Sequence, residues 1–152
     1  MTILVVDDEI SFRFLMRNLL RDKGHEVVLA EDGEDALKKL GEAKVDIIIS
    51  DVYMPVMDGF RLHRAVRSNP AFEKIPFLFV SGYDDQYTQE AVKDSKVDGF
   101  VRKGAPVQEL LDRIAFLTLP EEQRSIVKPE SRPKTSRDDW RDRRGGGKTP
   151  IY

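Results

Sequence analysis

The sequence predicts an α/β fold in which a five-stranded parallel sheet is doubly wound, with helices on both of its faces. Short apolar runs rich in β-branched residues alternate along the chain with longer segments that have helical apolar spacing. The runs are continuous rather than interrupted by polar residues, which is typical of strands buried on both faces. Strand–helix alternation implies right-handed crossovers, and these place parallel strands in one sheet.

Five segments fit such buried strands. The first, Ile3–Val6, ends at a run of acids, and the most apolar, Val45–Ser50, has three consecutive isoleucines near its centre. The others are Glu26–Ala30, Pro76–Val80 and Val97–Val101. In an open parallel sheet the functional crevice lies beyond the carboxyl ends of the strands, so the residues that end these segments are the first candidates for a site.

Five helices are expected, each with one inward apolar stripe of residues three and four apart. The predicted inward residues are Phe12, Leu15, Met16, Leu19 and Leu20 in the first helix, Ala36, Leu37 and Leu40 in the second, Phe60, Leu62, Ala65 and Val66 in the third, and Val107, Leu110, Leu111, Ile114 and Ala115 in the last. The fourth, residues 85–94, is mostly polar. Gly24 and Gly41 are placed to end the first two helices, and Pro106 suits the first turn of the last.

Charge divides the chain into two parts. Residues 1–119 hold 21 acidic and 16 basic side chains, whereas residues 120–152 hold 6 and 9, which together give the net charge of −2. Helical apolar spacing stops at Pro120, and the last segment is interrupted by prolines and by Gly145–Gly147. Such a segment buries too little apolar surface to offset its ordering entropy. We expect a domain over 1–119 and a flexible basic tail over 120–152.

Several classes of protein are excluded by composition. Without cysteine there is no disulfide framework, thiolate zinc site or cysteine nucleophile. No apolar run approaches the roughly 20 residues that cross a bilayer, so no membrane insertion is expected. The start lacks the basic flank and cleavage site of a signal peptide, which favours a cytoplasmic bacterial protein.

Charged and hydroxyl side chains end the predicted strands. They are Asp7 and Asp8 after the first, Asp51 after the third, Ser81 after the fourth and Lys103 after the fifth. Three close carboxylates repel one another and require a counter-charge. Oxygen ligands favour a hard cation such as Mg²⁺, which commonly joins one or two carboxylates to phosphate oxygens.

These residues resemble the receiver domain of bacterial response regulators, the phosphoacceptor half of two-component signalling. The resemblance depends on Asp7-Asp8, the run Asp51-Val-Tyr-Met-Pro-Val-Met-Asp-Gly59, Ser81-Gly82 and Phe100-Val-Arg-Lys103. It covers roughly residues 1–118, about one domain. It implies a flavodoxin-like sheet of strand order 2-1-3-4-5.

The resemblance implies a phosphoryl group and a metal ion at this edge. Asp51 would accept the phosphoryl group from a histidine kinase or a phosphotransfer protein. Asp8 and Asp51 would bind Mg²⁺ directly, together with the backbone carbonyl of Tyr53, and Asp7 would act through a bound water. The chain would then be a signalling protein with at most slow self-dephosphorylation, rather than an enzyme.

The resemblance also implies a switch. Ser81 and Lys103 would contact the phosphoryl oxygens, and Phe100 would swing inward as Ser81 moves. The surface formed by the fourth helix, fifth strand and fifth helix would then bind a downstream protein, relay the phosphoryl group or form a phosphorylation-dependent homodimer. Interleaved acids weaken the basic field of the tail, and no length remains for a DNA-binding domain, so no contact with nucleic acid is expected.

Three positions depart from the family pattern. Members usually have proline after the lysine with a cis bond between them, but Gly104 follows Lys103 here, so we predict a trans bond because cis before glycine costs about 3 kcal/mol. Tyr53 and Tyr83 each follow a site residue by two positions and could shield an acyl phosphate from water. We therefore hypothesise slow self-dephosphorylation, which a lifetime of seconds in the purified phosphoprotein would contradict.

Three alternatives remain from the residues alone. A pseudo-receiver would never be phosphorylated, although the set of site residues is intact. A Mg²⁺-dependent phosphohydrolase with an aspartate nucleophile would also use Asp51 but requires a second acid where the chain has Tyr53. A flavodoxin-like electron carrier conflicts with the acidic strand ends. His25 and His63 have no paired ligand spacing and are interpreted as surface residues.

Overall fold

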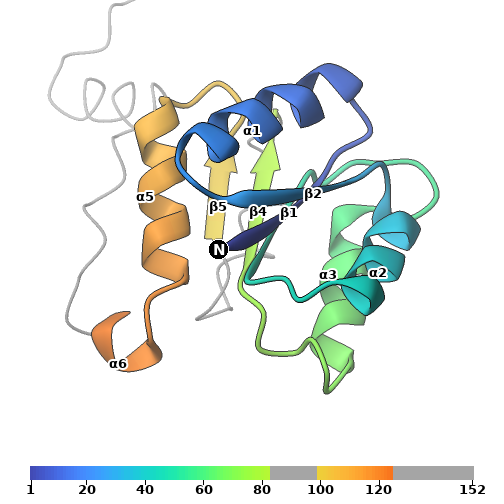
Figure 1. Cartoon of the computed structure of the whole chain (residues 1–152). Coiled ribbons are helices and arrows are strands. Elements are labelled where there is room, and N and C mark those ends of the chain that lie inside the picture. Colours follow the sequence, from blue (N-terminus) through green and yellow to red (C-terminus); the bar gives the residue numbers. More distant parts are fainter. Residues whose placement is uncertain (83–98, 125–152) are drawn as a thin grey trace, which may run out of the picture. The chain divides into compact units, whose positions relative to one another are not determined.

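A computed structural model describes residues 1–82 and 99–124 (Figure 1). Its sheet consists of β1 (Thr2–Val6), β2 (Glu26–Ala30), β3 (Ile47–Ser50), β4 (Phe77–Ser81) and β5 (Gly99–Arg102). Every pairing is parallel, and the strand order is β2-β1-β3-β4-β5. The predicted doubly wound sheet and its strand order are confirmed.

The described helices are α1 (Ile10–Asp22), α2 (Gly33–Glu42), α3 (Gly59–Ser68), α5 (Val107–Leu117) and the short α6 (Glu121–Arg124). The helix predicted over 85–94 lies outside the described residues. The chain divides into two compact units, Met1–Pro120 and Glu121–Tyr152, and α6 begins the second. Whether 120–152 is a flexible tail stays a prediction. In the described ranges, no helix has the length and apolar character that a membrane span requires.

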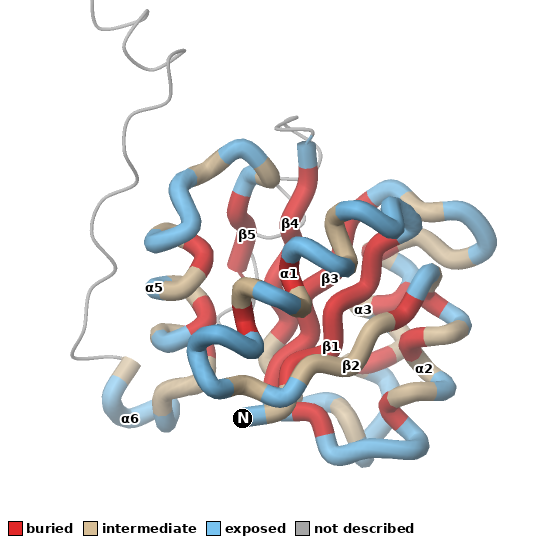
Figure 2. The backbone as a smooth tube through the Cα atoms, turned by 45° about the horizontal axis from the view of Figure 1, so that its top comes forward, coloured by how far each residue is buried: buried red, intermediate tan, exposed pale blue. Residues whose placement is uncertain are grey.

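The sheet separates two apolar cores because successive side chains of a strand point to opposite faces. Ile3 and Val5 of β1 pack with residues of α1 and α5, whereas Leu4 and Val6 pack with residues of α2 and α3. β1, β3, β4 and β5 are buried along most of their length, whereas the edge strand β2 is mostly half-buried, and helices lie on both sides of the sheet (Figures 1 and 2). Both faces are therefore covered, as the continuous apolar runs predicted.

Two helix ends show how the local sequence sets the helix boundaries. Gly24 has a positive φ of 89°, and the amides of Gly24 and His25 donate to the carbonyls of Arg21 and Leu20. This Schellman arrangement confirms Gly24 as the stop of α1. At the other end of a helix, the Asp58 carboxylate accepts a hydrogen bond of 2.8 Å from the Arg61 amide and so begins α3.

Several predicted boundaries were wrong by one or two residues. β4 begins at Phe77 because Pro76 has no amide to donate, and it ends at Ser81, which pairs with Arg102. β3 begins at Ile47, although Val45 before it is also buried. α2 continues through Gly41 to Glu42, so this glycine does not end the helix.

The predicted helix stripes were too wide. Leu15 is 63% exposed and Val107 is 50% exposed, and Ala115 also lies on the surface. A helix packed on one sheet buries a narrower set of positions than its apolar residues suggest, here Met16 and Leu20 in α1. The histidines, conversely, are less exposed than predicted: His25 is half-buried, and the ring of His63 lies 5.1 Å from that of Phe77.

Candidate functional site

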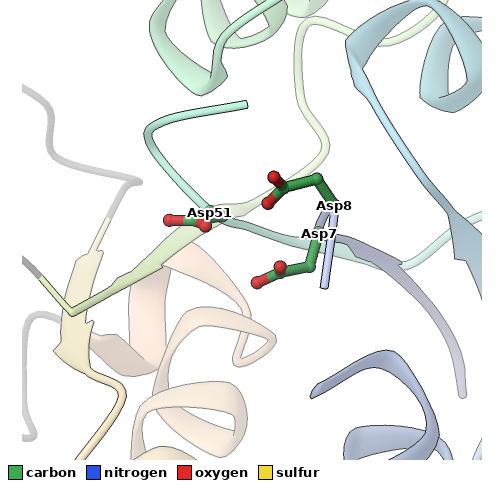
Figure 3. A group of neighbouring side chains, drawn as sticks. All are labelled: Asp7, Asp8 and Asp51. Atoms are coloured by element: carbon green, nitrogen blue, oxygen red, sulfur yellow. The ribbon is translucent and has the colours of Figure 1, made fainter. Parts of the chain in front are cut away.

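Three carboxylates meet where β1 and β3 end. Because these strands are neighbours in the sheet, Asp7 and Asp8 after β1 lie beside Asp51 after β3 (Figure 3). One carboxylate oxygen from each lies within 4.8 Å of the others. Asp7 is fully buried and Asp51 is 7% exposed, whereas Asp8 faces solvent. The sheet edge therefore concentrates negative charge at the boundary between core and water.

The backbone fixes how two of these carboxylates point. The amide of Asp51 donates to the carbonyl of Val6 at 2.9 Å, which extends the β1–β3 ladder into the site. Oδ1 of Asp7 accepts from the Glu9 amide at 2.8 Å, and Oδ1 of Asp51 accepts from the Val52 amide at 2.7 Å. In each residue the other oxygen, Oδ2, remains for interactions inside the cluster.

Lys103 supplies the counter-charge from the end of β5. Its Nζ lies 2.8 Å from Oδ2 of Asp7 and 3.2 Å from Oδ2 of Asp51. Its amide donates to the carbonyl of Ser81 at 3.0 Å, which fixes the start of the loop after β5. The Lys103–Gly104 bond is trans, as predicted, since the described residues contain no cis peptide.

Burial and the Lys103 ammonium have opposite effects on the pKa values of Asp7 and Asp51. Burial raises the pKa of Asp7 and of Asp51 above the ordinary value, and Lys103 counteracts only part of the shift. Burial acts in the opposite sense on Lys103, but its contact with Asp7 and its attraction to Asp51 raise the pKa of the ammonium. The ammonium is therefore charged at neutral pH, and one positive charge balances two buried carboxylates incompletely.

The donor set fits a hard divalent cation. Oδ2 of Asp7 is buried and lies 2.8 Å from the Lys103 ammonium, in the geometry of an ion pair. A buried acceptor of this kind is suited to a metal-bound water. Together with the exposed Asp8, the cluster provides oxygen ligands of the type that Mg²⁺ prefers.

Removing the ammonium should destabilise the metal-free protein. We expect Lys103→Met, which keeps most of the apolar stem, to lower the free energy of unfolding by about 2 kcal/mol, because Asp7 and Asp51 lose their counter-charge. Protonation of one carboxylate limits the loss. Urea unfolding at neutral pH with a chelator measures it. An unchanged unfolding midpoint would contradict a stabilising role for the ion pairs.

The loop that follows Asp51 contains a strained turn. The Met57 amide donates to the carbonyl of Pro55 at 2.8 Å, and Val56 between them has a φ of 69°. This is a γ-turn of the rare positive-φ form. The Gly33 amide of α2 donates to the carbonyl of Met57, so the turn is held from outside. A β-branched residue is poorly suited to this conformation.

Relieving the strain should stabilise the fold. Val56 is 65% exposed, so its side chain contributes little packing. We expect Val56→Gly to raise the free energy of unfolding by about 1 kcal/mol, since glycine adopts positive φ without steric cost. Val56→Ala is the matched control because it shortens the side chain but keeps Cβ. Equal effects of the two substitutions on urea unfolding would show that strain at Val56 is not the cause.

The remaining predicted site residues lie around this cluster. Ser81 is fully buried at the end of β4, and Tyr53 lies two residues after Asp51 with 44% of its surface exposed. Phe100 is 9% exposed and pairs with Phe79 in the β4–β5 register, in the core beside α2 and α3. The side chain of Phe100 is therefore buried in this structure. Tyr83 lies outside the described residues.

Two neighbours of Lys103 were not predicted as site residues. Oε1 of Glu9 lies 3.6 Å from Nζ, and the ring centroid of Phe12 lies 4.6 Å from it. The sequence placed Phe12 only in the inward stripe of the first helix. Its position one turn after Asp8 could have suggested that Phe12 lies near the site. Its contact with Lys103 could not be predicted, because the two residues are far apart in the chain.

Known proteins are similar to this chain in sequence and in fold. Residues 3–115 match the family model described as the response regulator receiver domain. The chemotaxis protein CheY4 of Vibrio cholerae is 35% identical, with a TM-score of 0.71 over 76% of this chain and 97% of that chain. The response regulator protein TrrA of Thermotoga maritima, solved in complex with Mg²⁺ and BeF, is 28% identical, with a TM-score of 0.68 over 76% of this chain and 97% of that one.

Longer relatives match over part of their length. Response regulator MprA of Mycobacterium avium is 34% identical over 130 residues, which are 84% of this chain and 56% of MprA. The CAI-1 autoinducer sensor kinase/phosphatase CqsS of Vibrio cholerae is 34% identical over 114 residues, which are 74% of this chain and 17% of CqsS. The chain therefore spans from about a sixth to about half of these relatives.

Proposed function

The chain belongs to the family of response regulator receiver domains, and from this membership we propose that Asp51 is the phosphoacceptor of a two-component phosphorelay. The observation that carries the proposal is the Lys103 ammonium, which lies between the buried carboxylates of Asp7 and Asp51 at the carboxyl edge of the sheet. This arrangement leaves a nucleophilic oxygen beside fixed charges that can neutralise a phosphoryl group.

The proposed reaction is an in-line transfer. A carboxylate oxygen of Asp51 forms a bond to the phosphorus of a phosphohistidine on a kinase or phosphotransfer protein, while the phosphorus–nitrogen bond breaks and its electron pair returns to the imidazole. The products are an aspartyl phosphate and the unmodified histidine. Lys103 and Ser81 would contact the phosphoryl oxygens, so the protein contributes positioning and charge rather than a covalent catalyst.

The proposed cation is Mg²⁺. Asp8, Asp51 and the backbone carbonyl of Tyr53 would hold it, and Asp7 would hold one of its waters. Mg²⁺ would supply positive charge to the transferring phosphoryl oxygens. The related TrrA was solved with Mg²⁺ and BeF, and the cluster of Asp7, Asp8 and Asp51, with the buried Oδ2 of Asp7, supports the same donor set here.

The proposed output is a change in partner binding. As Ser81 engages the phosphoryl group, the pairing of β4 with β5 would transmit the change to Phe100. It would also reach the surface formed by β5, α5 and the helix predicted over 85–94. That surface would bind a downstream protein or a second copy of the chain. Pull-down with the wild type, Asp51→Ala and beryllofluoride-treated protein tests this output. A partner retained equally by all three would contradict switching.

Phosphoryl uptake tests the proposed function directly. Incubation with acetyl phosphate or a cognate histidine kinase should add one phosphoryl group in the presence of Mg²⁺ and none in the presence of a chelator. Borohydride reduction of the acyl phosphate followed by peptide mass spectrometry should locate it at Asp51. Lack of uptake from either donor would favour a pseudo-receiver, and repeated turnover of small phosphate esters would favour a phosphohydrolase.

A further inference from the structure

The Lys103 ammonium has two kinds of neighbour. Asp7 and Asp51 contact it at 2.8 and 3.2 Å, and both belong to the carboxylate cluster that fits a metal. A third carboxylate, that of Glu9, lies 3.6 Å from Nζ, but its side chain is 63% exposed to solvent. The Phe12 ring, with its centroid 4.6 Å from Nζ, also lies outside the cluster and carries no charge. The Lys103 side chain is 18% exposed, so this contact is largely shielded from water.

The two kinds of contact respond differently to a bound cation. A divalent cation among the carboxylates would take up their charge and repel the ammonium, which weakens both ion pairs. The attraction between an ammonium and the face of an aromatic ring depends on neither carboxylate. Phe12 therefore provides a contact that persists when the site is loaded.

The ring is itself held in place. Phe12 lies in the first turn of α1 and packs against the apolar core that includes Met16 and Leu20. Lysine, in contrast, has a flexible four-carbon stem whose ammonium can occupy many positions. A ring fixed by helix packing restricts those positions.

We propose that Phe12 is a positioning residue whose ring holds the Lys103 ammonium beside Asp51 during phosphoryl transfer. The inference rests on the proposed function, since the ammonium must neutralise a phosphoryl oxygen on Asp51 for its position to matter. Phe12 would touch neither the phosphoryl group nor the metal and would act only through Lys103.

The chain offers a matched control on the same helix. Phe14 makes the same type of contact with Arg17, whose guanidinium carbon lies 4.5 Å from the ring centroid. Phe14→Leu therefore removes an aromatic ring and a cation–π contact from α1 without removing the neighbour of Lys103. Phe12→Tyr keeps an aromatic face, and Phe12→Leu removes it but remains apolar.

The experiment measures the rate of phosphorylation by acetyl phosphate at saturating Mg²⁺ and the beryllofluoride concentration for half-saturation. Phe12→Leu should lower the rate and raise the half-saturating concentration by about threefold to tenfold, with little change in the half-saturating Mg²⁺ concentration. Phe12→Tyr and Phe14→Leu should match the wild type. Phe12→Met, which also lacks a ring, replaces Phe12→Leu if the latter fails to fold.

A double-mutant cycle with Lys103→Met separates positioning from packing. In the Lys103→Met background, Phe12→Leu should have no further effect on the beryllofluoride titration or on the phosphorylation rate. An equal effect in both backgrounds would show a merely structural role and overturn the proposal. So would a wild-type response from Phe12→Leu and Phe12→Met. Failure of the wild type itself to accept beryllofluoride and a phosphoryl group would instead overturn the proposed function.

Discussion

Asp51→Asn should leave the protein unable to accept a phosphoryl group while making the metal-free fold more stable. The amide lacks the nucleophilic carboxylate oxygen, so the rate of uptake from acetyl phosphate should fall to the background. Stability should rise because Lys103 would then balance the single fully buried carboxylate of Asp7 rather than two buried acids. We expect a gain of about 1 kcal/mol or more in the free energy of unfolding.

The stability that Asp51→Asn gains over the wild type should increase with pH. Burial raises the pKa of Asp51 in the folded protein above its ordinary value, so the folded state binds this proton more tightly than the unfolded state does. Its ionisation therefore costs nothing below about pH 4 and destabilises the fold progressively as the pH rises through the folded pKa. The difference between Asp51→Asn and the wild type should widen from acidic to neutral pH.

Mg²⁺ and a surface control complete the test. Mg²⁺ should raise the unfolding midpoint of the wild type, since the proposed metal site is formed only in the folded protein, and should have much less effect on Asp51→Asn. Asp112→Asn, which changes an exposed acid of α5, should behave as the wild type in every assay. A metal-free Asp51→Asn protein that is less stable than the wild type would contradict the charge imbalance described here.

Gly59→Ala should be the most destabilising single-methyl change among the described glycines. A Cβ at Gly59 would overlap the carbonyl oxygen of Asp51 and would lie 3.0 Å from Cα of Val52. Both atoms belong to backbone, and the Gly59 amide also donates to the Val52 carbonyl at 2.7 Å. We expect a loss of about 3 kcal/mol or more, because neither segment can move without breaking the end of β3.

Two other glycines provide the comparison. A Cβ at Gly33 would meet side-chain atoms of Met57 rather than backbone, with Cβ, Cγ and Sδ all within 2.8 Å, and one at Gly41 would meet nothing within 4 Å. Gly33→Ala should therefore cost less than Gly59→Ala, and Gly41→Ala inside α2 should stabilise by up to about 1 kcal/mol. Urea unfolding of the three variants measures this order. A Gly59→Ala protein as stable as the wild type would show that the loop yields to α3.

The sheet and the acidic cluster were predictable because they depend on local rules. Continuous apolar runs predicted buried strands, and the polarity of a parallel sheet brings Asp7, Asp8 and Asp51 to one edge whatever the details of packing. The start of β4 also depends on local chemistry, since Pro76 cannot donate to the ladder, but its effect on the boundary was missed.

The features that were not predicted depend on contacts between segments that are distant in the chain. The exposure of Leu15 and Val107 is decided by how much of each helix the sheet covers, which helical spacing alone does not contain. The positive φ of Val56 results from a turn that α2 holds in place. Phe12 gains its role from a lysine that follows 91 residues later and ends a different strand.

Lys103 ends the last strand of the sheet, and its pairing with Asp51 spans 52 residues of chain. During synthesis, the two buried acids therefore emerge from the ribosome well before their counter-charge. Until β5 has joined the sheet, the edge carries unbalanced negative charge and lacks the ammonium that would neutralise an incoming phosphoryl group. An unfinished chain would thus be a poor phosphoryl acceptor, and competence for signalling would arrive together with completion of the fold.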